Sequence, residues 1–261
     1  MGDSKQPNHH FVLVHGLGHG AWCWYKLTTL LRSAGHRATT IDLSASGIHP
    51  TIFHDIRNFD EYAKPLIDFL VSLPHDDRVI LVGHSFGGLS LALAMERFPN
   101  KISLAVFLSA FMPDTASPPA HVINEYFERN LIKSWMDTKF TYDGGPDKPP
   151  TTMLFGPEIL INNLYQNCPM EDYTLAITLV RVGSLFQDEL TNLPAFSTGR
   201  YGSVDRAFVI CGEDKIIPRD YQIWMSENNA VEVVKEIEGA DHMAMLSKPK
   251  ELFELLMEIA H

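Results

Sequence analysis

The chain has 261 residues, of which 45% are hydrophobic and 20% charged, a composition that excludes a disordered protein and supplies enough apolar side chains for one large core. Its 32 acidic residues outnumber 21 lysines and arginines, and the net charge of −11 at pH 7 argues against nucleic acid or an anionic membrane surface as a partner.

The N-terminal ten residues are polar, and no apolar run reaches the length of a spanning helix. The longest run, residues 104–112, is interrupted by Ser109. Three cysteines, Cys23, Cys168 and Cys211, are too few and too far apart for a disulfide framework or a zinc knuckle. We therefore expect a soluble, cytoplasmic protein with reduced thiols and no metal.

Short apolar runs alternate with segments of helical periodicity in the first part of the chain. Strands are expected at residues 10–14, 37–43, 78–82 and 102–108, and helices at 24–34, from Asn58 onward, and at 86–97. Asn58-x-x-Glu61 resembles a capping box, and Pro65 within the helix that follows indicates a kink or a late start.

The rhythm changes in residues 113–190, which contain no convincing strand but show helical segments at 122–133, 157–165 and 171–182. Alternation then returns, with strands at 207–210 and 231–237 and helices at 219–228 and 249–260. This order predicts an α/β fold with a mostly parallel, doubly wound sheet. Residues 1–112 and 191–261 form its core and residues 113–190 a helical cap insertion, within a single domain.

Gly83-His84-Ser85-Phe86-Gly87 matches the motif G-x-S-x-G, in which a serine lies at a sharp turn between a strand and a helix. The expected strand and helix flank it here. Glycine at the outer positions relieves crowding at such a strained turn. The motif predicts Ser85 as a nucleophile, with the free N–H groups of the helix start available to an oxyanion.

A serine hydroxyl needs a base, and in this arrangement the acid and the histidine follow it in chain order, on loops after later strands. Asp214 comes soon after strand 207–210, and His242 soon after strand 231–237. The predicted triad is therefore Ser85, His242 as general base, and Asp214 to orient the imidazole ring.

Two neighbouring carboxylates are rivals for the acid. Glu213 would point elsewhere if Asp214 points inward, and Asp241 adjoins His242 too closely to reach round to its ring.

A second motif competes near the N-terminus. Gly16-Leu17-Gly18-His19-Gly20-Ala21 follows a strand, and Asp42 ends the next one, as in a dinucleotide-binding fingerprint. Trp22 and Trp24 crowd the place of a pyrophosphate, and this reading leaves the predicted triad unexplained. The alternative, which we favour, is an oxyanion loop, with the N–H groups of Leu17 and Phe86 as donors and no cofactor. His15 and His19 would line the pocket or support this loop.

Several segments together resemble the plant methylesterase and hydroxynitrile lyase family of the α/β-hydrolase superfamily, which includes methyl salicylate, methyl jasmonate and alkaloid esterases. These segments are 10–16, 20–22, 24–27, 34–36, 42–43, 83–88, 111–114, 183–186, 200–203, 213–215 and 240–246, and the weakest match is 116–152. The resemblance implies an α/β-hydrolase core with a helical cap, the same triad and oxyanion donors, and a frequent tendency to form homodimers.

Within that family, the lyases resemble this sequence but have threonine where Gly16 stands and lysine where Met243 stands. Gly16 leaves room for an ester carbonyl, and Met243 supplies no ammonium for a nitrile leaving group. We therefore expect a serine carboxylesterase of plant specialised metabolism that cleaves small methyl esters (alkaloid, iridoid or phytohormone). The alternatives are an α-hydroxynitrile lyase and a non-catalytic small-molecule receptor.

The substrate pocket is expected to be apolar and built largely by the cap. Trp135 matches a family position that carries an aromatic residue against the substrate. The full set of expected pocket residues is His15, Gly16, Phe127, Trp135, Met153, Phe155, Leu160, Leu164, Leu185 and Met243.

Overall fold

The computed structural model describes residues 8–129, 131–132, 134–145, 150–229 and 231–260. A six-stranded sheet in the order β2-β1-β3-β4-β8-β9 organises the molecule, and every neighbouring pair in it is parallel. The strands are β1 (His10–Val14), β2 (Arg37–Ile41), β3 (Val79–Ser85), β4 (Ile102–Ala110), β8 (Arg206–Cys211) and β9 (Val233–Ile237). The expected α/β class is confirmed.

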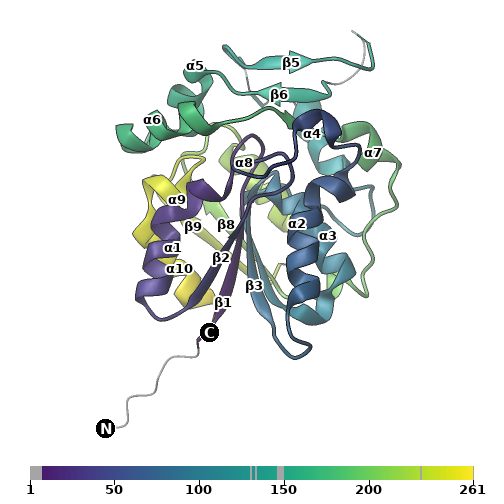
Figure 1. The fold of residues 1–261 in the computed structure, drawn as a ribbon, viewed down its shortest axis with the longest axis vertical. Coiled ribbons are helices and arrows are strands. Elements are labelled where there is room, and N and C mark those ends of the chain that lie inside the picture. The colour runs from purple at the N-terminus through teal and green to yellow at the C-terminus, as the bar shows by residue number, and fades with distance from the viewer. Residues whose placement is uncertain (1–7, 130, 133, 146–149, 230, 261) are drawn as a thin grey trace.

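Helices cover both faces of this sheet, as Figure 1 shows: α1 and α10 lie on one side, and α2 and α3 on the other. The helices outside the β4–β8 connection are α1 (Tyr25–Ser33), α2 (Phe59–Ser72), α3 (Gly87–Arg97), α8 (Arg219–Glu227), α9 (Ala244–Ser247) and α10 (Pro249–Ile259). Short 3-10 turns lie at Ala21–Trp24, Phe53–Asp55, Pro99–Lys101 and Tyr201–Ser203.

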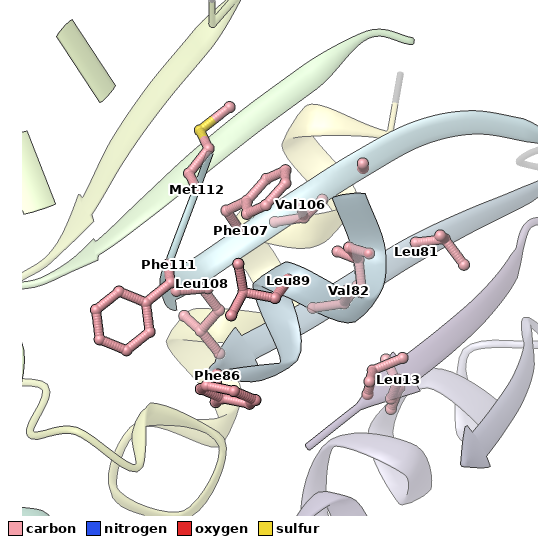
Figure 2. Packing of buried hydrophobic residues seen from close by; sticks show 14 of the residues in the cluster. Leu13, Leu81, Val82, Phe86, Leu89, Val106, Phe107, Leu108, Phe111 and Met112 are labelled. Carbon is pink, nitrogen blue, oxygen red and sulfur yellow. The ribbon is translucent and has the colours of Figure 1, made fainter. Parts of the chain in front are cut away.

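The core forms where both faces of the central strands are covered. β1 and β3 are buried at every position. Burial on both faces of the sheet explains why their sequences are apolar without alternation, except at the strand ends. Figure 2 shows Leu13 of β1, Val82 of β3, Phe107 of β4 and Leu89 of α3 among the side chains of this buried cluster. Helix α3 is buried along nearly its whole length, which fixes the turn that precedes it.

Helix α2 begins at Phe59, directly after its cap residue Asn58, and contains Pro65. The expectation that Pro65 would delay the start of this helix was wrong. The Asn58 side chain accepts a hydrogen bond from Glu61 N over 2.8 Å, and Glu61 Oε2 accepts one from Arg57 N over 2.9 Å. Two N–H groups at the helix start are thereby satisfied, which explains why the helix begins there despite the proline.

The segment between β4 and β8 differs from the expectation. It contains three short strands, β5 (Lys139–Thr141), β6 (Thr152–Leu154) and β7 (Gly183–Ser184), paired antiparallel in the order β5-β6-β7. The expectation of no strand here was wrong, because runs of two or three residues with polar members are too short to show a period. Figure 1 shows β5 and β6 above the large sheet, beyond the carboxyl ends of its strands.

The helices of this segment are shorter than expected. They are α4 (His121–Glu128), α5 (Pro157–Ile159) with a π-helical turn at Leu160–Leu164, α6 (Met170–Leu179) and α7 (Gln187–Asn192). Two residues of the expected helix 122–133, 130 and 133, lie outside the described residues, as do residues 1–7 at the N-terminus. Helix α7 was missed, and it crosses the expected cap boundary at residue 190.

None of the helices in the described part of the chain combines the length and the apolar character needed to cross a lipid bilayer.

Candidate active site

Ser85 ends β3 in a left-handed backbone conformation, with φ of 54°. L-residues rarely adopt this region, so the turn stores strain that its surroundings must hold. A Cβ atom on Gly87 would lie 2.5 Å from the carbonyl oxygen of His15, so only glycine fits directly after the turn. The G-x-S-x-G motif thus has the strand, the strained turn and the helix that its chemistry requires.

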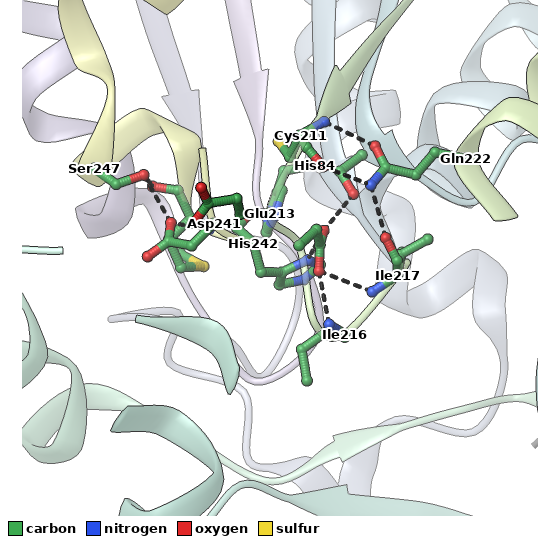
Figure 3. Close-up of polar contacts among 12 residues, drawn as sticks. His84, Cys211, Glu213, Ile216, Ile217, Gln222, Asp241, His242 and Ser247 are labelled. Atoms are coloured by element: carbon green, nitrogen blue, oxygen red, sulfur yellow. Dashed lines mark hydrogen bonds and ion pairs between the residues drawn. The ribbon is translucent and has the colours of Figure 1, made fainter. Parts of the chain in front are cut away.

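Asp214 and His242 meet on the loops that follow β8 and β9. Asp214 Oδ2 lies 2.7 Å from His242 Nδ1, and both side chains are almost fully buried. Asp214 Oδ1 accepts hydrogen bonds from the N–H groups of Ile216 and Ile217 at 2.7 and 2.9 Å. Since the carboxylate can only accept, Nδ1 of His242 carries the hydrogen and Nε2 is left as the basic nitrogen. Figure 3 shows this group of contacts.

The rivals of Asp214 take other partners. Glu213 Oε2 accepts a hydrogen bond from Asn167 Nδ2 at 2.8 Å, and Asp241 accepts hydrogen bonds from Asn167, Met243 and Ser247. Of the three candidate carboxylates, Asp214 is the one that contacts the His242 ring.

His84, next to the serine, ties the serine turn to the histidine loop. Its Nε2 donates a hydrogen bond of 2.7 Å to the backbone oxygen of His242, and the two ring centroids are 4.5 Å apart. Burial holds the pKa of His84 well below its ordinary value, so this ring is neutral at pH 7. The motif around Ser85 predicts no role for His84, because its position is the variable x.

The loop after β1 is held in shape by His15. Its Nδ1 lies 2.8 Å from the Gly16 carbonyl oxygen, and its Nε2 accepts from Leu43 N at 3.1 Å. The Gly16 carbonyl belongs to the same peptide unit as the Leu17 N–H, so His15 orients that N–H. A Cβ on Gly16 would lie 2.8 Å from Ser85 Cβ, which places this loop against the serine. Of the two roles open to His15, the contacts favour support of the loop.

A cavity opens beside Ser85. Its lining residues are Leu17, Ser85, Phe86, Phe111, Ile123, Tyr126, Phe127, Trp135, Met153, Phe155, Leu185 and Ile216. Among the described lining residues, the one hydroxyl besides that of Ser85 belongs to Tyr126, and it donates to Ile216 O over 2.6 Å. An occupant of this cavity therefore meets hydrocarbon and aromatic surface around a single reactive hydroxyl.

Five expected pocket residues line the cavity: Phe127, Trp135, Met153, Phe155 and Leu185. The others are placed differently.

Gly16 lies against Ser85 rather than in the lining, and Met243, Leu160 and Leu164 are buried outside it. Phe111 and Tyr126 line the cavity but were not expected. Phe111 falls in a stretch that resembles the methylesterase family, which was the available signal for it.

The contacts of Asp42 and Gly20 argue against the dinucleotide-binding interpretation. Asp42, which would bind a ribose, accepts hydrogen bonds from Ala21 N and Ile48 N at 2.6 and 3.3 Å. A Cβ on Gly20 would lie 2.5 Å from Gly47 Cα, so that glycine serves a close approach of two loops. Among the described residues, no group of three histidine, cysteine, aspartate or glutamate side chains could hold a metal ion.

A family profile described as Alpha/beta hydrolase family matches residues 11–255. The chain belongs to the alpha/beta hydrolase family. The hydrolase is 48% identical to Methylesterase 1 of Arabidopsis thaliana over 261 residues, which cover 100% of this chain and 98% of the relative. It is 50% identical to Norfluorocurarine synthase 2 of Strychnos nux-vomica over 252 residues, or 96% and 95% of the two chains.

Its fold matches the crystal structure of polyneuridine aldehyde esterase with a TM-score of 0.92 at 46% identity, covering 98% of this chain and 100% of that one. The resemblance to plant methylesterases, given above on the sequence motifs, is confirmed by these relatives.

Proposed function

We propose that this hydrolase cleaves small methyl esters whose acyl group carries no charge, through an acyl-enzyme on Ser85. The observation that carries the proposal is the strained Ser85 in the wall of an apolar cavity, with the buried Asp214–His242 pair on the adjoining loops. Relatives named methylesterase and polyneuridine aldehyde esterase support the choice of ester hydrolysis.

The reaction follows from these groups. His242 Nε2 takes the Ser85 proton as the serine oxygen attacks the ester carbonyl carbon, and the N–H groups of Leu17 and Phe86 stabilise the oxyanion that forms. His242 then gives this proton to the methoxy oxygen, and the carbon–oxygen bond breaks so that methanol leaves and the acyl-enzyme remains. A water molecule, deprotonated by the same nitrogen, attacks the acyl-enzyme, and His242 returns the proton to the Ser85 oxygen as the carboxylic acid leaves.

The segment between β4 and β8, with boundaries near residues 113 and 190, acts as a cap that shapes the acid side of the pocket. It supplies Phe127, Trp135, Phe155 and Leu185 to the cavity. A charged acid or amine buried against these side chains would lose its hydration without gaining a partner, which costs several kcal/mol. The proposal is therefore restricted to uncharged aromatic or terpenoid acyl groups.

Substitution of the serine tests the proposal. We expect Ser85→Ala to lower kcat for methyl esters by about 10⁴-fold or more, as the loss of a triad nucleophile does elsewhere. Ser90→Ala, in buried α3, is the matched control and should keep wild-type rates. Near wild-type turnover by Ser85→Ala would refute the role of the serine.

A panel of substrates separates the remaining alternatives. Faster cleavage of cyanohydrins than of methyl esters by the wild-type protein would favour the lyase. Tight binding of the acid without multiple turnovers of any ester would favour a receptor.

A further inference from the structure

Glu213 and Asp241, the two carboxylates that flank the proposed triad in sequence, bind the same short stretch of the β4–β8 segment. Asn167 N donates to Asp241 Oδ2 over 2.9 Å, and Asn167 Nδ2 donates to Glu213 Oε2 over 2.8 Å. Cys168 Sγ lies 3.3 Å from Asp241 Oδ2, and Gln166 Nε2 donates to Glu213 O over 2.8 Å. We call residues 165–168 the clasp.

The clasp also reaches the loop after β1. His19 Nδ1 lies 2.9 Å from Leu17 O, and His19 Nε2 lies 2.8 Å from the Tyr165 hydroxyl. Because Leu17 O can only accept, Nδ1 carries the hydrogen, and Nε2 of the neutral ring accepts from Tyr165. Burial lowers the pKa of His19 to about 3, so the ring is neutral at pH 7.

Each contact lies beside a residue that the reaction uses. Asp241 directly precedes His242, and its second oxygen accepts from Met243 N at 3.0 Å and from the Ser247 hydroxyl at 2.7 Å. Glu213 directly precedes Asp214. Leu17 provides both the carbonyl that His19 holds and the N–H proposed for the oxyanion. Figure 3 shows Glu213, Asp241 and His242 close together below the strand ends.

We propose that the clasp is a positioning element for the proposed triad and oxyanion loop: it holds the loops after β1, β8 and β9 at one spacing. These loops come from different strands, and the clasp contacts all three within four residues. The β4–β8 segment would then set the rate of acylation as well as the shape of the pocket. This inference rests on the proposed function, since it assumes that Ser85, Asp214 and His242 act together.

Two substitutions in the clasp, each with a matched control, test the idea. Tyr165→Phe removes the hydroxyl that His19 accepts, whereas Tyr25→Phe removes a hydroxyl that joins α1 to Asp172 of α6 at 2.8 Å without touching the three loops. Asn167→Ala removes the side-chain hydrogen bonds to the loops of Glu213 and Asp241. Its control, Asn162→Ala, removes a hydrogen bond from Asn162 Nδ2 to Glu158 O, one helical turn away.

The readouts are kcat and KM for the best methyl ester, and the second-order rate at which an alkyl fluorophosphonate labels Ser85. In the labelling step the serine oxygen bonds to phosphorus, fluoride leaves and His242 takes the proton. We expect Tyr165→Phe and Asn167→Ala, which remove one and two hydrogen bonds, to lower kcat and the labelling rate about 3- to 10-fold each, with KM within twofold. Both controls should stay within twofold of wild type in every readout.

Thermal unfolding separates a loss of fold from a loss of positioning. Since Asn167 is exposed, Asn167→Ala should unfold at the wild-type temperature and keep the test valid even if Tyr165→Phe is unstable. Clasp variants that label and turn over at the rates of their controls, or that change KM alone, would overturn the inference. Absence of labelling at Ser85 in the wild-type protein would instead overturn the proposed function, and the clasp with it.

Discussion

The hydroxyl of Ser109 lies 2.6 Å from Asp214 Oδ2, the carboxylate oxygen that also faces His242. Ser109 is fully buried near the end of β4, with φ of 38°. Since a carboxylate can only accept, the Ser109 hydroxyl donates to it. Each oxygen of Asp214 therefore accepts two hydrogen bonds: Oδ2 from Ser109 and His242, and Oδ1 from the N–H groups of Ile216 and Ile217. The orientation of the acid is thus fixed before any substrate binds.

Loss of the Ser109 hydroxyl should loosen this arrangement. We expect Ser109→Ala to lower kcat about 10-fold and the free energy of unfolding by about 1–3 kcal/mol, because a hydrogen bond to a buried charged group is lost. Steady-state kinetics and urea unfolding measure the two effects. Ser103→Ala is the control on the same strand, since its hydroxyl bonds Val79 O instead. Equal kinetics for the two variants would contradict a role of Ser109 in holding the acid.

A side chain at Gly16 should impair ester cleavage. Its Cβ would lie 2.8 Å from Ser85 Cβ, and neither atom can move without a shift of its backbone. We expect Gly16→Ala to lower kcat/KM by about 100-fold or more, the cost typical of losing one oxyanion donor. Gly199→Ala, where a Cβ would meet nothing within 4 Å, is the control.

Gly16→Thr extends the test to the lyase alternative. The threonine side chain is larger than a methyl group, so it should lower the rate of ester cleavage more than Gly16→Ala does. If the threonine variant keeps wild-type esterase activity, the close packing of Gly16 on Ser85 does not matter for the reaction.

Much of the fold and the contact between Asp214 and His242 could be predicted, because both depend on local signals. Apolar runs mark the parallel strands, and the motif around Ser85 together with chain order leads to Asp214 and His242. Contacts between distant parts of the chain give no such signal. Ser109 is 105 residues from Asp214, and its only trace in the sequence is a polar residue interrupting an apolar strand. The link from Tyr165 to His19 spans 146 residues and left none.

Trp135 should control which acyl groups fit. It lines the cavity, and its ring is 6.1 Å from that of Phe127, another lining residue. We expect Trp135→Ala to raise KM for a compact aromatic methyl ester about 10-fold, since burial of a ring against it is lost, and to raise kcat/KM for bulkier polycyclic esters. Competition assays with the two ester classes give the ratio.

Phe140→Ala is the control for this change, because its ring packs on Trp135 at 5.5 Å but does not line the cavity. An unchanged preference between the two ester classes in Trp135→Ala would place the acyl group elsewhere.

His19 should make the stability of the protein depend on pH in the acid range. Its pKa is about 3 in the folded protein because of burial, and 6.5 in the unfolded chain. Below pH 6.5 the unfolded chain therefore binds a proton that the folded protein does not, and stability falls as the pH falls from about 6.5 toward 3. The contribution of one such histidine is about 1.4 kcal/mol per pH unit. Burial also lowers the pKa values of His15 and His84, which adds in the same direction.

Urea unfolding at pH 7.5, 6 and 5 measures this dependence. We expect His19→Gln to be less stable than wild type at pH 7.5, because the Tyr165 and Leu17 hydrogen bonds are disturbed, but to lose less stability on acidification. The difference between the two slopes should approach 1.4 kcal/mol per pH unit below pH 6. His75→Gln, at a fully exposed position, should leave the slope unchanged. A wild-type slope in His19→Gln would mean that the ring between Tyr165 and Leu17 accepts a proton in the folded protein, and the assignment of Nε2 as the acceptor of the Tyr165 hydrogen bond would be wrong.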